Sequence, residues 1–174
     1  MSKIAYNLAS IKAVVFDVDG VLSPSTIPLG EDGIPRRMVN IKDGFALQYA
    51  AKTGLKIAII TGANAPGVEQ RFRSLGITDF YSGAAMKLPI LQKWMEKNSL
   101  RPEDVAFVGD DVPDYQCMEY VGLSVAPCDA APDILEIARY TSPCKGGYGV
   151  ARDLLEELLR ATGRWALHQK AFGW

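Results

Sequence analysis

The chain has 174 residues, of which 48% are hydrophobic and 22% charged, and its formal net charge at pH 7 is −1. This length suits one globular domain with a full core, and the small charge gives no reason to expect nucleic acid or an anionic membrane as partner. No apolar run approaches the roughly 18 residues that span a bilayer, and the first ten residues lack the apolar core of a secretory signal.

The cysteine pattern points to a reducing compartment. Cys117, Cys128 and Cys144 are odd in number and far apart along the chain. Their spacing indicates neither a zinc site nor a disulfide framework. We therefore expect reduced thiols and a cytoplasmic protein.

Strand-like and helix-like segments alternate along the chain, which is typical of a parallel sheet with helices on both faces. Apolar runs predict strands at 13–16, 55–60, 80–81, 105–108, 123–126 and 140–141. Helical patterns cover 43–53, 66–75, 87–98, 113–122, 129–138 and 150–162. Asp43 is expected to cap the first helix. The sequence therefore predicts a single α/β domain, residues 1–174, with a three-layer α/β/α arrangement.

Two segments lie outside this alternation. Residues 23–40, called the flap below, are rich in Pro and Gly, and a turn at Glu31-Asp32-Gly33 predicts a short β-hairpin. Residues 163–174 form a C-terminal tail with Trp165, His168, Phe172 and Trp174. Its aromatic side chains either insert into a partner subunit or fold onto the core of their own chain. We expect no catalytic role for His168.

Acidic residues follow two of the expected strands. Asp17-Val18-Asp19-Gly20 comes directly after 13–16, and Gly109-Asp110-Asp111-Val112-Pro113-Asp114 directly after 105–108. In an open parallel sheet, ligands bind at the carboxyl ends of the strands. Carboxylates crowded there repel one another unless a cation lies among them, and a hard ion such as Mg2+ prefers oxygen ligands. The pattern predicts an Mg2+-dependent enzyme that acts on phosphate.

The first acidic segment offers the residues for covalent chemistry. A carboxylate such as Asp17 can attack phosphorus and form an aspartyl-phosphate, which divides hydrolysis into two easier steps. Asp19 can protonate the leaving alkoxide and later take a proton from water. Taken alone, however, Asp-x-Asp-Gly is also a common polar turn.

Further candidates follow the second strand, begin the helix at 87–98 and follow the fourth strand. Thr61 and Gly62 can hold phosphate oxygens, although a Thr at this place is more often a helix N-cap. Lys87 can pair with phosphate and with Asp17, although a lone Lys is usually solvated. Asp110 can anchor a metal ion, although an Asp-rich helix start also interacts well with the helix dipole.

The order of these motifs resembles the haloacid dehalogenase-like superfamily, specifically its phosphatases. The resemblance implies that Asp17 is the nucleophile and Asp19 the general acid and base, while Thr61, Gly62 and Lys87 bind the phosphoryl group.

The same resemblance implies the metal site. Mg2+ would be held by the Asp17 side chain, the main-chain carbonyl of Asp19 and Asp110. Asp111 and Asp114 would lie behind these ligands and orient metal-bound water or Lys87.

The spacing of the motifs leaves no room for the separate cap domain that many superfamily members carry. A capless chain with a flap resembles the 3-deoxy-D-manno-octulosonate 8-phosphate phosphatases, which are tetramers of lipopolysaccharide precursor synthesis. By this resemblance the substrate is a sugar acid phosphate, and its contacts are Asn40, Ile41, Lys42, Asp43, Gly44 and Arg71. The loop at 146–149 also resembles their C-terminal region.

Three positions depart from that group. Ala63, Gln48 and Tyr148 stand where its members usually have Arg, and fewer guanidinium groups weaken the grip on a sugar carboxylate. A nine-carbon nonulosonate 9-phosphate, of the sialic acid type, is therefore an alternative substrate. A non-catalytic subunit that senses a ligand or scaffolds an assembly is an alternative of another class.

Overall fold

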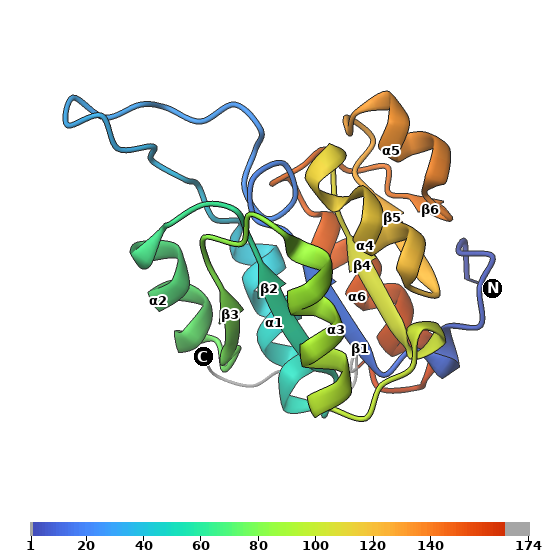
Figure 1. Ribbon diagram of the computed structural model, residues 1–174. Coiled ribbons are helices and arrows are strands. Elements are labelled where there is room, and N and C mark those ends of the chain that lie inside the picture. Colours follow the sequence, from blue (N-terminus) through green and yellow to red (C-terminus); the bar gives the residue numbers. More distant parts are fainter. Residues whose placement is uncertain (1, 166–174) are drawn as a thin grey trace.

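A computed structural model of the chain describes residues 2–165. Its centre is a parallel sheet of six strands in the order β3-β2-β1-β4-β5-β6 (Figure 1). The strands are β1 (Ala13–Phe16), β2 (Lys56–Ile60), β3 (Asp79–Tyr81), β4 (Val105–Val108), β5 (Leu123–Ala126) and β6 (Tyr140–Thr141). The predicted parallel sheet and the α/β class are confirmed.

Helices cover both faces of the sheet. The helices are α1 (Ile41–Lys52), α2 (Pro66–Ser74), α3 (Lys87–Lys97), α4 (Tyr115–Tyr120), α5 (Pro132–Ile137) and α6 (Val150–Ala161). Helices α1, α2 and α6 bury side chains in one core cluster and α3, α4 and α5 in the other. In Figure 1, α3 and α4 lie in front of the sheet and α1 and α6 behind it.

The alternation along β1 shows how one strand serves both cores. Val14 and Phe16 belong to the cluster under α1 and α6, whereas Ala13 and Val15 belong to the cluster under α3 and α4. Successive side chains of a strand point to opposite faces, so a strand buried on both sides is apolar throughout. This explains why the short apolar runs could be assigned as strands.

Two helix starts differ from the sequence prediction. The N-cap of α1 is Asn40, whose side-chain oxygen accepts hydrogen bonds from the backbone N–H groups of Lys42 and Asp43. The prediction that Asp43 caps this helix was wrong, because Asn40 supplies the same chemistry three residues earlier. Helix α5 begins at Pro132, since Asp129 instead accepts a hydrogen bond from the backbone of Gly146.

Short 3-10 turns that the sequence did not indicate complete the connections. They are η1 (Leu8–Ser10), η2 (Pro102–Asp104) and η3 (Val112–Asp114). The last of these replaces the first turn of the helix expected from residue 113 and leads into α4.

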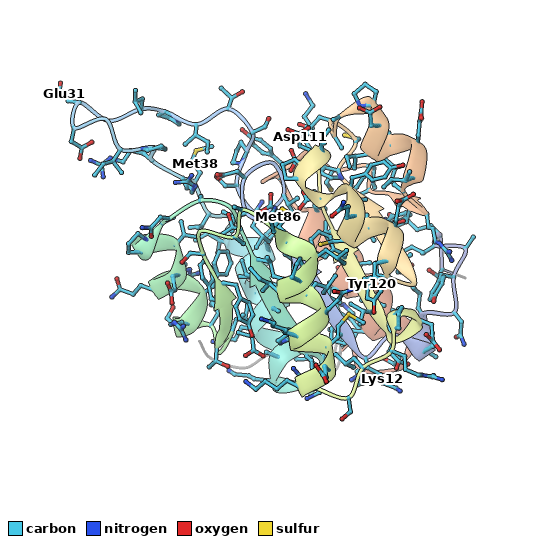
Figure 2. All side chains as sticks on the ribbon, in the orientation of Figure 1. Lys12, Glu31, Met38, Met86, Asp111 and Tyr120 are labelled. Carbon is cyan, nitrogen blue, oxygen red and sulfur yellow. The ribbon has the colours of Figure 1, made fainter. Side chains whose placement is uncertain are left out.

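The flap projects from the carboxyl ends of the strands, away from the layered body (Figures 1 and 2). An antiparallel bridge joins Leu29 to Pro35, and the backbone N–H of Gly33 donates to the carbonyl of Gly30. Glu31, labelled in Figure 2, lies at the far end of this loop. The flap is thus a narrow hairpin-like loop with a single described bridge.

Trp165 packs on its own chain. Its ring meets Phe45 and Tyr49 edge to face, with centroids 6.3 and 5.7 Å apart, and the Arg152 guanidinium lies 4.5 Å from its ring centroid. This agrees with the interpretation that the tail folds onto its own core. The predictions for His168, Phe172 and Trp174 lie outside the described residues. Within residues 2–165, no helix has the length and apolarity that a membrane span requires.

Candidate active site

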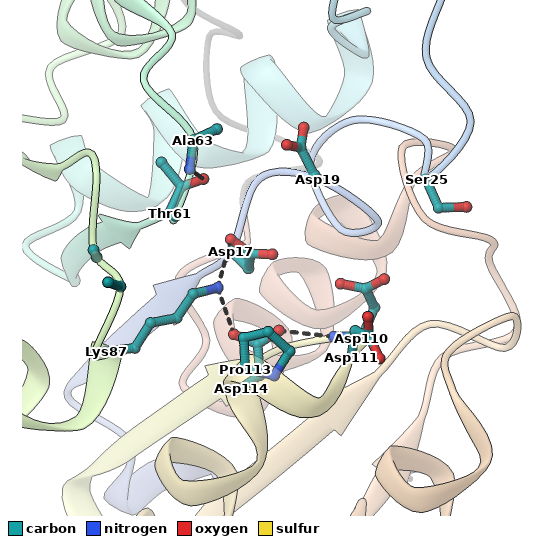
Figure 3. A pocket seen from close by; sticks show the side chains of 13 residues that line it. Asp17, Asp19, Ser25, Thr61, Ala63, Lys87, Asp110, Asp111, Pro113 and Asp114 are labelled. Carbon is teal, nitrogen blue, oxygen red and sulfur yellow. Dashed lines mark hydrogen bonds and ion pairs between the residues drawn. The ribbon is translucent and has the colours of Figure 1, made fainter.

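The chemistry-bearing residues meet because their strands are neighbours. Asp17 follows β1, Thr61 follows β2 and Asp110 follows β4, and β1 lies between β2 and β4 in the sheet. Parallel strands end at one edge, so the three side chains surround one cavity of about 500 Å3 (Figure 3). Asp19, Gly62, Lys87, Asp111 and Asp114 also line it.

Lys87 lies at the centre of the cavity floor. Its ammonium nitrogen is 2.8 Å from Oδ1 of Asp17 and 2.7 Å from Oδ1 of Asp114 (Figure 3). The side chain is only 4% exposed. Burial works to lower the pKa of Lys87, but the two carboxylates outweigh burial and raise it, Asp114 more than Asp17. Lys87 is therefore a fixed positive charge rather than a solvated surface lysine.

One lysine does not neutralise the carboxylates around it. Asp17, Asp110 and Asp114 each offer an oxygen within 4.8 Å of the others. Burial first, and Asp114 second, raise the pKa of Asp17 to about 7. Burial, followed by Asp17 and Asp114, raises the pKa of Asp110 to about 8. Both shifts reflect burial first and repulsion between the carboxylates second, and a bound cation would relieve this repulsion.

The donor set fits Mg2+. Oδ1 of Asp17 is buried and, although it pairs with Lys87, accepts no well-aligned hydrogen bond among the described residues. The carboxylate of Asp110 likewise accepts none in the described part of the chain. Hard oxygen donors with unused lone pairs are the ligands that Mg2+ prefers.

Asp114 supports the other residues of the floor. One of its oxygens accepts a hydrogen bond from Lys87 and the other from the backbone N–H of Asp110, at 2.7 and 3.1 Å. Asp111 points elsewhere, since its carboxylate accepts from the backbone N–H of Val112 at the start of η3. The sequence offered Asp111 and Asp114 as acids that could orient Lys87, and in the structure Asp114 is the one that contacts it.

Gly20 allows Asp110 to approach the first acidic segment. Its φ is +85°, which favours glycine, and a Cβ at this position would overlap the carboxylate of Asp110. The loop at 146–149 packs against the same segment, because the backbone N–H of Gly147 donates to the carbonyl of Val21 at 2.8 Å. The turn after β1 is therefore held from both sides.

Thr61 is buried at the end of β2 and does not cap a helix. Its hydroxyl accepts a hydrogen bond from the backbone N–H of Ala63 at 3.2 Å, whereas the N-cap of α2 is Ala65. The helix-cap explanation of this Thr is thus excluded. The hydroxyl and the adjacent Gly62 line the cavity beside Lys87.

Asp19 has a partner that the sequence did not reveal. Nε and Nη2 of Arg37, in the flap, donate to its two carboxylate oxygens at 2.6 and 2.8 Å. The bond to Asp19 raises the pKa of the Arg37 guanidinium further. Arg37 lies eighteen residues after Asp19, and no periodic pattern in the sequence signals this contact.

The expected sugar contacts lie outside this cavity in the single chain. Asn40 and Lys42 line a different pocket, at the start of α6, of about 360 Å3. Ile41 is 66% exposed. Arg71 lines a groove of about 440 Å3 between the flap and α2, and its guanidinium lies over Gly44.

Asp43 is buried and caps a helix other than its own. Its carboxylate accepts a hydrogen bond from the backbone N–H of Arg152, in the first turn of α6, at 2.7 Å. The N-cap position of α6 is Gly149, which has no side chain to do this. Burial raises the pKa of Asp43 to about 6 in spite of these hydrogen bonds.

Known proteins resemble this chain in sequence and structure. The sequence model of the haloacid dehalogenase-like hydrolase family matches residues 77–154 of this chain. A 3-deoxy-D-manno-octulosonate 8-phosphate phosphatase of Escherichia coli K12 is 41% identical over 155 residues, which are 89% of this chain and 82% of that one. The chain belongs to the haloacid dehalogenase-like hydrolases.

Solved structures place this hydrolase among the same relatives. The crystal structure of the 3-deoxy-D-manno-octulosonate 8-phosphate phosphatase of Yersinia pestis superimposes with a TM-score of 0.87 at 37% identity, covering 91% of this chain and 85% of that one. That of Moraxella catarrhalis, a complex with magnesium, phosphate and KDO, has a TM-score of 0.85 at 29% identity and covers 89% of both chains.

Proposed function

We propose that this hydrolase is an Mg2+-dependent phosphatase that releases phosphate from 3-deoxy-D-manno-octulosonate 8-phosphate. The observation that carries the proposal is the buried pairing of Lys87 with Asp17 and Asp114 beside Asp110, at the strand ends. Relatives of 41 and 38% identity bear the name of this activity. Asp17, Asp19, Lys87 and Asp110 line one cavity, which disfavours a non-catalytic subunit.

In the proposed reaction, Asp17 and Asp19 divide the work. A carboxylate oxygen of Asp17 attacks phosphorus, and the bond from phosphorus to the sugar oxygen breaks. Asp19 gives a proton to the leaving sugar oxygen and then takes one from the water that attacks the aspartyl-phosphate. Phosphate leaves and the Asp17 carboxylate is restored.

The other residues stabilise charge. Lys87 and Thr61 hold the phosphoryl oxygens at the cavity floor, and Lys87 offsets negative charge as it builds. Asp17, the carbonyl of Asp19 and Asp110 would hold Mg2+, with Asp114 fixing Asp110 and Lys87 from behind. Bound Mg2+ would neutralise the phosphoryl group and make it open to attack by a carboxylate.

A panel of sugar phosphates tests this proposal. With Mg2+ supplied, we expect the fastest phosphate release from the eight-carbon keto acid 8-phosphate. Asp17→Asn should lower turnover on the order of a thousandfold or more, because it removes the nucleophile. Equal turnover of Asp17→Asn and the parent chain would contradict the mechanism. Absence of turnover on the whole panel would favour a non-catalytic subunit.

Ala63 is the reason to test a second candidate substrate. It lines the cavity beside Thr61 and offers no guanidinium for a sugar carboxylate. A higher kcat/KM for a nine-carbon nonulosonate 9-phosphate than for the eight-carbon substrate would assign the chain to that substrate instead.

The assembly and the compartment are parts of the same proposal. Leu29, Ile34, Met38 and Val39 of the flap are 70, 53, 48 and 42% exposed, a large apolar surface for one short segment. We propose that the flap is covered in a homotetramer, which light scattering at working concentration would detect. The three cysteines are free thiols, which suits the cytoplasm.

A further inference from the structure

The flap bonds to the body of the molecule at its two ends, through the backbone of Ser23 and the side chain of Asn40, and between these ends through the side chain of Arg37. Among the described residues, the hydrogen bonds of Arg37 to Asp19 are the ones that leave residues 24–39, and the rest stay within that segment. The side chain of Arg37 is 11% exposed, whereas that of its neighbour Arg36 is 60% exposed and pairs with Asp32 inside the flap. Arg36 thus forms an ion pair within the flap, whereas Arg37 connects the flap to the body of the molecule.

The contact of Arg37 is geometrically demanding. A guanidinium that donates from two nitrogens to both oxygens of one carboxylate fixes its rotation as well as its position. A bridge to Ser23 holds the backbone at Asp19, but the rotation of its side chain is left to be set by a side-chain partner. Arg37 supplies that direction from the flap, and the Asp19 side chain remains 35% exposed toward the cavity mouth.

From this geometry we infer that Arg37 is a positioning residue that aims Asp19 at the leaving oxygen of the substrate. This inference rests on the proposed phosphatase function, in which Asp19 transfers the proton. Both oxygens of Asp19 are engaged before substrate enters, so one bond to Arg37 must open for Asp19 to reach the leaving oxygen. The remaining bond keeps the carboxylate in place while it acts.

The nature of the leaving group makes the inference testable. A sugar alkoxide leaves with difficulty unless it is protonated, whereas p-nitrophenolate leaves without a proton. Asp19 also activates the water that hydrolyses the aspartyl-phosphate, and this later step is common to both substrates. A defect in the direction of Asp19 must therefore lower kcat/KM, which reports the steps up to release of the leaving group, more for a primary sugar phosphate than for p-nitrophenyl phosphate. A defect in folding, metal binding or phosphate binding slows both substrates alike.

The experiment measures kcat and KM for both substrates with saturating Mg2+ on four proteins. These are the parent chain, Arg37→Ala, Arg37→Lys and the control Arg36→Ala. For Arg37→Ala we expect kcat/KM for the sugar phosphate to fall about 10- to 100-fold and kcat/KM for p-nitrophenyl phosphate less than about threefold. Arg37→Lys should be intermediate, because lysine keeps the charge but not the two-pronged contact. Arg36→Ala should match the parent.

A double variant separates positioning from structural loss. If Arg37 acts through Asp19, then adding Arg37→Ala to Asp19→Asn should change kcat less than about twofold. Equal losses on both substrates, an undiminished effect in the Asp19→Asn background, or parental kinetics of Arg37→Ala would each overturn the inference. If the parent chain itself releases no phosphate from either substrate, the proposed function fails instead.

Discussion

The cavity floor and the flap hold their functional side chains in different ways. On the floor, Asp17, Lys87 and Asp114 are 6, 5 and 1% exposed, and Lys87 forms ion pairs with both acids. In the flap, Leu29 is 70% exposed and Arg37 makes the ion pair that reaches the body. Burial and several charged contacts hold each side chain of the floor, whereas between its two ends the flap is bonded to the body through Arg37.

This difference separates two functions of the molecule. Residues that must hold a phosphoryl group to a fraction of an ångström lie directly after buried strands, which cannot shift without disturbing two cores. The flap can change its sequence and path at little cost to the fold, as connecting segments generally do. We therefore expect substitutions on the floor to have large effects and matched substitutions in the flap small ones.

Replacement of one glycine in each region gives the largest contrast. Gly20 and Gly33 have φ values of +85° and +73°, so replacement by alanine introduces similar backbone strain at both positions. A Cβ at Gly20 would overlap the Asp110 carboxylate, whereas one at Gly33 would have no neighbour within 4 Å. Gly20→Ala should lower Mg2+ affinity and activity about 100-fold or more, and Gly33→Ala should lower activity less than about twofold. Magnesium titration of phosphate release measures both, and parental Mg2+ affinity in Gly20→Ala would contradict the close packing.

Removal of the buried Lys87 ammonium tests how much the ion pairs of the floor contribute to the free energy of unfolding. Lys87→Met leaves Asp17 and Asp114 buried without their partner, which should lower the free energy of unfolding by about 3 to 5 kcal/mol. The control is Lys12→Met, because Lys12 pairs with Asp104 at 3.1 Å while its side chain is 59% exposed. Asp104 is buried but keeps its bonds to the backbone N–H and Nε of Arg101, so loss of the mostly exposed Lys12 should cost about 1 kcal/mol or less. Urea unfolding without Mg2+ compares the two variants, and equal losses would show that burial of the pair is unimportant.

The acids of the floor also predict an unusual pH dependence. Folding raises the pKa of Asp17 to about 7 and that of Asp110 to about 8, so the folded protein binds more protons than the unfolded chain above about pH 4. The stability that these groups contribute is therefore present at low pH and lost as the pH rises toward 8. Without Mg2+, we expect the free energy of unfolding to fall by about 1 to 3 kcal/mol between pH 5 and 8.

Magnesium is the control for this pH effect. The metal ion binds the deprotonated carboxylates, so saturating Mg2+ should flatten or reverse the slope. Asp110→Asn should reduce the slope without Mg2+, because the carboxyl with the higher pKa is gone. Thermal unfolding followed across the pH range, with and without a chelator, measures both. A slope that Mg2+ leaves unchanged would mean that the metal does not bind these acids.

The positions of Asp17 and Asp110 could be predicted from the sequence because each follows a short apolar run. The register of Asp17 and Asp110 is set by the strands 13–16 and 105–108, which the structure confirms. Once the two strands are neighbours, the two acids must be close. No information about distant side chains was needed.

Contacts between distant segments could not be predicted in this way. The bond of Arg37 to Asp19 depends on how the flap turns and returns over eighteen residues, which no periodic pattern encodes. Asp43 looks like an N-cap in the sequence, yet Asn40 takes that role and leaves Asp43 for another helix. Local rules identify a residue that can cap a helix, but packing decides which helix it caps.

Asp43 offers the smallest and most specific test, since it is a buried carboxylate outside the floor. Its oxygen caps α6, so Asp43→Ala should lower the free energy of unfolding by about 1 to 2 kcal/mol. Asp43→Asn keeps an acceptor oxygen and removes the charge whose pKa burial raises to about 6. The variant should therefore retain most of the stability, and its free energy of unfolding should fall less steeply than that of the parent between about pH 4 and 6, where Asp43 of the folded parent still holds a proton. Urea unfolding at two pH values compares the three proteins. If Asp43→Ala is as stable as the parent, the cap contributes nothing, and the buried acid needs another explanation.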